Sequence, residues 1–157
     1  MVGGAYCCAL EDGGPATAAY LAIPYGLAVD TAGNLYIAQA NGGGGNLVRK
    51  VSANGVITTV AGGGTASGDG GPATSARLAR PLGVAVDTAG NLFITEANGN
   101  RVRKISKSGT ITTIAGIDNP WHVAVDASGN LYVTQSSGAT VRSVTPDGTV
   151  TAIAGTG

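Results

Sequence analysis

The sequence has 157 residues, with nine basic and nine acidic side chains and only five Tyr, one Phe and one Trp. This length suits one domain. Its core has to be built from Ala, Val, Ile and Leu, which favours thin, closely stacked sheets over a bulky helical core. A net charge of zero weighs against nucleic acid or an anionic membrane as the main partner.

The N-terminal residues carry no sign of targeting or metal chemistry. The opening MVGGAYCC lacks the basic start and the continuous apolar stretch of a signal peptide, and no apolar run in the sequence reaches the length of a membrane span. The adjacent Cys7 and Cys8 have neither a CxxC partner nor a nearby histidine, so we expect two ordinary thiols. The sequence thus predicts a soluble chain and does not indicate its compartment.

Internal repetition is the dominant pattern of the sequence. A first unit contains LAVDTAGNLYIA at 27–38, LVRKVS at 47–52 and VITTVAG at 56–62. The same runs return in the same order twice more, at 84–95, 101–106 and 110–116, and at 123–134, 140–145 and 149–155. The first run of each unit divides into two strands at its DTAGN or DASGN turn, so each unit has four predicted strands. Four antiparallel strands repeated at about 40 residues are typical of the blade of a β-propeller.

The aspartate of each first turn is predicted to be structural. Asp30, Asp87 and Asp126 occupy the same step of the three units. An aspartate there can accept backbone N–H bonds within the turn, and Gly33 can take a positive φ. Because every blade needs this turn, we interpret the three carboxylates as scaffold and not as catalytic groups.

These patterns resemble NHL repeats, whose blades have sequences close to GVAVDxxGNLYIAD, NxRIRKV and ITTVAG. The segments EDGGPATAAYLAIPYGLAVD at 11–30 and GDGGPATSARLARPLGVAVD at 68–87 resemble the bacterial NHL proteins with long loops between blades. The resemblance covers nearly the whole chain and implies an all-β propeller with three blades. The predicted boundaries are a loop with a short helix at 1–25, blade one at 26–61, a second such loop at 62–82, blade two at 83–115 and blade three at 116–157.

The long loops are expected to cover the blades with short helices. Pro15 and Pro72 suit the first turn of such a helix, with Asp12 and Asp69 just upstream, where a carboxylate is favourable. The third unit departs from the pattern, because its loop is cut to three residues at 117–119. One blade is therefore expected to lack helical cover.

Three blades are fewer than the four to eight with which propellers typically close. Val2-Gly3-Gly4 resembles the tail of a preceding fourth strand, and the chain ends on a fourth strand, so both apolar end faces of the wedge would be exposed. The chain is then either a fragment of a longer propeller or half of a six-bladed ring that two copies close head to tail. We favour the six-bladed homodimer.

Residues that break the repeat at the channel mouth form the candidate ligand site. In a propeller, the first strand of each blade lies innermost, and its start shares one face with the end of the second strand. The residues at these positions are Tyr25, Trp121 and His122 from first strands and Gln39, Glu96 and Gln135 from second strands. His122 is the most distinctive, because the other two units have Gly26 and Gly83 in its place. The alternative interpretation is that Trp121 is an apolar plug and His122 a loop residue bonded to a neighbour.

Three functions remain open. The first, implied by the NHL resemblance, is a non-catalytic scaffold that binds a protein or a small ligand at the channel mouth and needs no cofactor. The second is a metal-assisted lyase or hydrolase using His122 and Glu96, as in related propeller enzymes, although a metal needs several converging ligands. The sequence has no GxSxG, no second histidine and no P-loop lysine motif.

The third function is RNA binding, which some animal NHL proteins show. The recurring Arg49-Lys50 and Arg103-Lys104 pairs would supply the positive charges, but Ser143 breaks the series and the chain has no net positive charge. We interpret the strand that carries these pairs as a packing strand with solvated ends.

Overall fold

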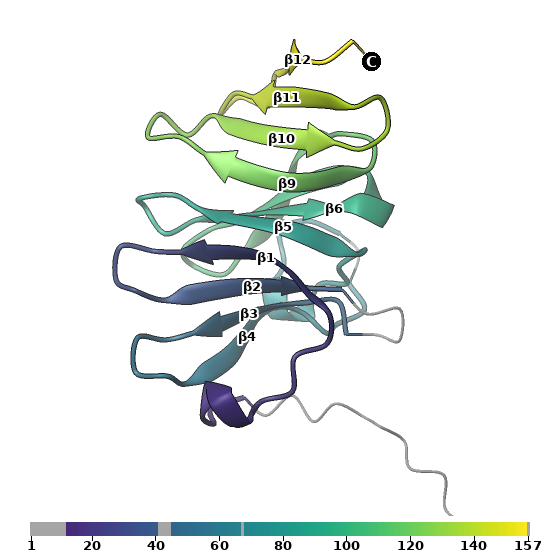
Figure 1. Ribbon diagram of the computed structural model, residues 1–157. Helices are drawn as coiled ribbons and strands as arrows, with labels where there is room; N and C mark the ends of the chain where they lie inside the picture. Colours follow the sequence, from purple (N-terminus) through teal and green to yellow (C-terminus); the bar gives the residue numbers. More distant parts are fainter. Residues whose placement is uncertain (1–11, 41–44, 67, 157) are drawn as a thin grey trace, which may run out of the picture.

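The structure, a computed structural model, describes residues 12–40, 45–66 and 68–156. Within them, consecutive strands form three four-stranded antiparallel sheets, in the orders β1-β2-β3-β4, β5-β6-β7-β8 and β9-β10-β11-β12. The strands are β1 Pro24–Val29, β2 Leu35–Gln39, β3 Leu47–Val51, β4 Ile57–Gly62, β5 Pro81–Val86, β6 Leu92–Glu96, β7 Arg101–Ile105, β8 Ile111–Gly116, β9 Pro120–Val125, β10 Leu131–Gln135, β11 Thr140–Val144 and β12 Val150–Ala154. The inner strands β1, β5 and β9 lie next to one another, and the sheets fan out from them (Figure 1). The predicted propeller blades, four strands each, are thus confirmed.

Each inner strand begins at a proline, and the predicted blade boundaries left out the first two of these, Pro24 and Pro81. Pro24, Pro81 and Pro120 pair with the last residue of the neighbouring second strand, across an irregularity in the ladder. Such a bulge lets the strand continue past a residue that has no N–H to donate. The first blade's strands therefore run from Pro24 to Gly62, where the sequence indicated 26–61.

Alternation along the strands divides the core into two layers between blades. In blade 2, Leu92 and Ile94 pack toward blade 1, whereas Phe93 between them packs toward blade 3. Successive strand side chains point to opposite faces of a sheet, so a middle blade contributes to both layers. Small and branched side chains fill these layers, as the composition indicated.

The turn aspartates have the structural role predicted for them. The Asp30 carboxylate accepts hydrogen bonds from the backbone N–H of Ala32, from both the backbone and side-chain N–H of Asn34, and from the Tyr36 hydroxyl. Gly33 has a φ of +80°, which the turn needs and glycine adopts readily. Asp87 and Asp126 bind Asn91 and Asn130 in the same way.

The two long loops carry short 3₁₀ helices, η1 Ala16–Ala18 and η2 Ala73–Ser75. Pro15 and Pro72 directly precede these helices in an extended conformation, one step earlier than predicted. There they form bridges with the outer strands' turns, Pro15 with Val56 and Pro72 with Thr110. A third 3₁₀ helix, η3 Ala97–Gly99, joins β6 to β7.

The residues that lead into each of these two helices, including its first residue, pair with the edge of an outer strand. We call residues 12–16 and 69–73 the edge segments. In blade 2, Gly70 N–H donates to the Ile111 carbonyl at 2.8 Å, and Ile111 N–H donates to the Gly71 carbonyl at 3.0 Å. Blade 1 has the same pattern between Gly13, Gly14 and Ile57. The edge segments thus satisfy backbone groups that a free sheet edge would leave unpaired.

Asp12 and Asp69 anchor the edge segments, a role different from the predicted stabilisation of a helix start. The Asp69 carboxylate accepts bonds from the Arg103 guanidinium and the Thr113 backbone N–H, both at 2.8 Å. Burial raises the Asp69 pKa, but the Thr113 hydrogen bonds and the nearby guanidinium charges outweigh this and bring the pKa below its usual range. Asp12 binds Arg49 and Thr59 in the same way.

Blade 3 differs at its outer edge. Residues 117–119 connect β8 directly to β9 and contain no helix, as the short loop predicted, and most of β12 is exposed. The segment with Cys7 and Cys8 lies outside the described residues, so the expectations for it stay predictions. Among the residues that the structure describes, none of the helices has the length and apolar character of a membrane span.

Candidate functional site

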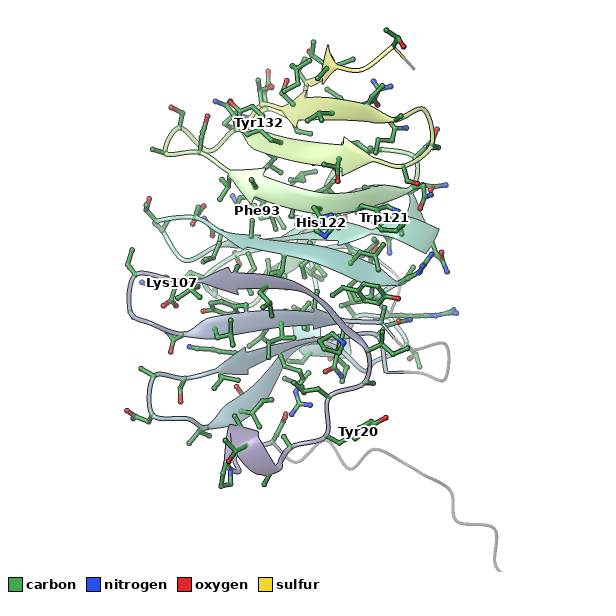
Figure 2. The ribbon with its side chains drawn as sticks, in the orientation of Figure 1. Tyr20, Phe93, Lys107, Trp121, His122 and Tyr132 are labelled. Atoms are coloured by element: carbon green, nitrogen blue, oxygen red, sulfur yellow. The ribbon has the colours of Figure 1, made fainter. Side chains whose placement is uncertain are left out.

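Trp121 and His122 lie in a bulge near the start of β9. The β9–β10 ladder pairs Pro120 with Gln135 and Val123 with Val133, and the register shifts between these pairs. The His122 N–H donates to the Thr134 hydroxyl at 2.9 Å, which holds the bulge against β10. Figure 2 shows the two side chains next to each other on the inner strand. Their ring centroids are 6.3 Å apart and the rings are tilted by 55°.

The indole of Trp121 borders a hollow of about 220 Å³, whose other lining residues are Thr134, Gln135 and Ser136. The Trp121 side chain is 39% exposed, while Leu82, at the same position in blade 2, is 1% exposed. Leu82 packs between Ala40 of blade 1 and Ala97 of its own blade. Trp121 and His122, which break the repeat, are therefore also the exposed residues at the start of β9.

The six predicted site residues separate into two groups. Tyr25, Trp121 and His122 are exposed at the starts of inner strands, whereas Gln39, Glu96 and Gln135 are buried at the ends of second strands. The exposed group is divided between blades 1 and 3, at the two ends of the wedge. The described structure therefore brings Trp121 and His122 together and leaves Tyr25 apart from them.

Two members of the buried group, Glu96 and Gln135, bind the third strand of their own blade. The fully buried Glu96 carboxylate accepts bonds from the Ala79 backbone N–H at 3.0 Å and from the Arg101 guanidinium, with Arg103 Nη1 3.8 Å away. The Gln135 amide oxygen accepts bonds from Thr140 and Arg142. These contacts tie the second strand to the third, so Glu96 and Gln135 act as structural groups here.

The arginines of the third strands are also engaged. Arg49 and Arg103 are buried and paired with Asp12 and Asp69. The lysines that follow them reach over ring faces, Lys104 at 5.9 Å from the centre of Phe93. The sequence indicated a packing strand with solvated ends, and the buried guanidinium groups do not face solvent as a phosphate-binding surface requires.

Sequence reasoning missed Thr95 and Thr134, whose hydroxyl groups bind the backbone of inner strands. The Thr95 hydroxyl accepts a bond from Gly83 N–H at 2.8 Å and donates to the Trp121 carbonyl oxygen at 2.5 Å. It thereby links β5 and β9 of two successive blades. The sequence does carry a signal, because a threonine precedes Glu96 and Gln135 in two of the three units. Comparison of the repeats assigns this threonine to the shared strand pattern and so does not single it out.

Among the described residues, no three His, Cys, Asp or Glu side chains lie close enough together to hold a metal ion. His122 is the only histidine of the chain, and the carboxylate that the sequence paired with it, Glu96, binds arginine. The arrangement at β9 therefore offers an aromatic face and an imidazole for contact with a ligand.

The stacked four-stranded blades, with inner strands that converge on one side, define the chain as part of a β-propeller. The Teneurin NHL domain family matches residues 5–67 and 63–121, and the chain belongs to this family. No curated protein matches the sequence significantly.

Several solved propellers share the fold. The chain superimposes on a structure of the nidogen/laminin complex with a TM-score of 0.67 and 22% identity, covering 84% of this chain and 48% of that one. The gluconolactonase XC5397 from Xanthomonas campestris gives 0.66 and 16%, with 87% and 48% covered. Virginiamycin B lyase from Staphylococcus aureus gives 0.61 and 21%, with 82% and 40% covered. The chain thus spans less than half the length of each of these proteins.

Proposed function

We propose that the chain is a non-catalytic binding module of the NHL propeller type, which holds a protein or small ligand at the channel-mouth face. The observation that carries the proposal is the exposed Trp121 beside His122, at a position where the equivalent residue of blade 2 is a buried leucine. Large aromatic side chains combine an apolar face with little conformational entropy to lose, and they dominate recognition sites. The backbone between them is held in place, because Thr95 and Thr134 bind the two polar atoms of the Trp121–His122 peptide group.

The chemistry of the site favours an uncharged ligand with a flat apolar group. The indole offers a stacking surface, and the imidazole of His122 offers one hydrogen-bond donor and one acceptor when neutral. A peptide with an aromatic side chain or a small aromatic amide has both features.

A catalytic function finds less support in the geometry. Similar solved structures include a lyase and a gluconolactonase, and another is described as a catalytically inactive H270A variant of virginiamycin B lyase. In the present chain, however, Glu96 is buried between arginines, so a general acid or metal ligand beside His122 would have to come from another residue. At identities of 16–21%, these likenesses concern the fold.

The test uses Trp121, the only tryptophan of the chain, as an intrinsic fluorescent reporter. A panel of aromatic amides and aromatic tripeptides is titrated into the protein, and we expect at least one compound to change the emission saturably. Ligand-observed NMR with the same compound should show binding lost in Trp121→Ala. The matched control is Tyr20→Ala, which removes another exposed aromatic ring, well apart from Trp121 (Figure 2), and should bind normally.

Equal binding by Trp121→Ala, or no binding by any compound at millimolar concentration, would overturn the proposal. Turnover of a bound lactone or ester that disappears in His122→Ala would favour the catalytic function instead.

A further inference from the structure

Among the residues that the structure describes, nothing covers one apolar face of the first blade and one of the last. The blade 1 free face consists of Ile23, Tyr25, Leu27 and Val29. The blade 3 free face consists of Ala124, Tyr132 and Thr134, all exposed, whose equivalents in blade 2 face blade 3. Exposed apolar groups gathered in this way mark an interaction surface in a folded protein.

Blade 2 shows what covers the same positions when a neighbour is present. Leu27 is 62% exposed, whereas its equivalent Val84 is 4% exposed and packs against blade 1. Tyr132 is 38% exposed, whereas its equivalent Phe93 is 5% exposed and packs against blade 3. The two free faces are therefore the two halves of a blade–blade junction of the kind that the chain already contains twice.

We propose that a second copy of this chain occupies both free faces, with blade 3 of each copy packed on blade 1 of the other, so that two wedges close a six-bladed ring. The interfaces within the chain supply the geometry, since each new junction pairs the same strands as β1–β5 and β5–β9. The solved propellers supply the size, because this chain spans 40–48% of their length. A head-to-tail contact that closes after two steps gives a discrete dimer and not a filament.

A polar contact is already positioned for this junction. Thr134 accepts the His122 N–H as Thr95 accepts that of Gly83. Thr95 uses its own proton to bind the carbonyl oxygen of Trp121 in the next blade. In the ring, the equivalent acceptor for Thr134 is the carbonyl oxygen of Tyr25 in the second copy. This inference deepens the proposed function, because closing the ring would bring the blade that carries Tyr25 in one copy next to the blade that carries Trp121 in the other.

His122 makes the new junction different from the internal ones. A Cβ on Gly26 would lie 2.5 Å from the Leu82 carbonyl oxygen, and a Cβ on Gly83 would lie 2.7 Å from the Trp121 carbonyl oxygen. Both distances are well below ordinary van der Waals contact, so the internal junctions need glycine at this position. His122 has its Cβ there, and the backbone of the second copy must stand further away. The junction beside Trp121 is consequently wider at the channel mouth than the two internal ones.

Sedimentation velocity on the whole chain tests the partner. We expect a dimer at micromolar concentration and a monomer for Leu27→Asp, whose side chain is exposed on the blade 1 free face and plays no part in the internal core. The matched control Thr88→Asp adds the same charge at an exposed turn of blade 2 and should stay dimeric. A wild-type chain that is monomeric at several hundred micromolar, or that forms open-ended polymers, would overturn the proposal, as would equal dimerisation of Leu27→Asp and Thr88→Asp.

The wider junction is tested with His122→Gly. Removing the Cβ lets the two copies approach as the internal blades do, and we expect the dimer dissociation constant to fall at least tenfold and Trp121 to become less accessible to acrylamide. A dissociation constant that rises or stays unchanged would contradict the role of His122. These measurements use no ligand, so they test the dimer separately from ligand binding at the channel mouth. A monomeric chain that still binds an aromatic amide through Trp121 would overturn the dimer and leave the proposed function in place.

Discussion

At the scale of single residues, the repeat distinguishes residues that stabilise every blade from residues that are available to contact a ligand. Asp30, Asp87 and Asp126 are carboxylates in a turn that each blade needs, and their oxygens are taken up by N–H groups. Gly83 is equally constrained, because the backbone of β9 passes directly over it. Where the repeat has His122 in place of glycine, an exposed side chain stands near the start of β9.

The close approach at Gly83 predicts a position-specific cost. We expect Gly83→Ala to lower the free energy of unfolding by about 1–3 kcal/mol, because the new Cβ meets backbone that cannot yield without moving a blade. Gly116→Ala is the control, since the nearest heavy atom to its Cβ would be 4.0 Å away, and it should change stability by less than about 0.5 kcal/mol. Urea unfolding of both variants measures the difference, and equal effects would show that the contact at Gly83 is not close.

The turn aspartates predict a loss of stability in acid. Hydrogen bonds from the side chain and backbone of Asn130 hold the pKa of Asp126 below its usual range. A lowered pKa in the folded state stabilises the protein above the unfolded-state value near 4 and loses this contribution as the pH falls through the folded-state value. Asp126→Asn should therefore be less stable than the wild type at pH 6, with a smaller difference at pH 3. Urea midpoints across this range test it, and parallel pH profiles would contradict it.

At the scale of elements, the outer strands are finished in two ways. β4 and β8 pair with the edge segments, and buried arginines reach the aspartates that anchor those segments. The short connection before β9 provides no such segment, and β12 is mostly exposed. The sequence placed the long loops correctly, but their attachment to an outer strand through Asp12 and Asp69 was visible only once distant residues had come together.

The anchor of the second edge segment predicts a clear effect of its removal. Asp69→Ala leaves the fully buried Arg103 without its closest carboxylate partner and frees the Thr113 N–H. Because the Asp69 side chain is itself partly solvated, we expect a loss of about 1–3 kcal/mol, together with faster hydrogen exchange at Ile111. Asp118→Ala, at an exposed position in the short connection before β9, is the control and should leave both quantities close to wild type. Unchanged exchange at Ile111 in Asp69→Ala would contradict the anchoring role.

At the scale of the whole molecule, three blades form a wedge with two core layers between them, and no described residue covers the face at either end. The internal junctions show that these end faces have the pattern of a blade interior. Their burial by a second copy would turn an open wedge into a ring and would place the channel-mouth residues of both chains on one face.

Ring closure predicts that thermal stability depends on protein concentration. If folding is linked to pairing of two copies, the melting temperature should rise by about 2 °C for each tenfold increase in concentration. Leu27→Asp should melt at a lower temperature that is independent of concentration. Calorimetry or circular dichroism over a hundredfold range of concentration measures this, and a constant wild-type melting temperature would contradict the linkage.

The sequence by itself determined the blade, because three copies of one pattern of alternating apolar residues and turn residues can satisfy their backbone groups only as repeated four-stranded sheets. It also marked Trp121 and His122, since a break in a repeat needs no coordinates to be seen. The tertiary structure decided which candidates are accessible: Glu96 and Gln135 looked like channel-mouth groups in the alignment, yet their side chains turn inward to Arg101 and Arg142. It also decided why the other two blades have glycine at the position of His122, because the distance between inner strands depends on how the blades pack, and neighbouring blades are far apart along the chain.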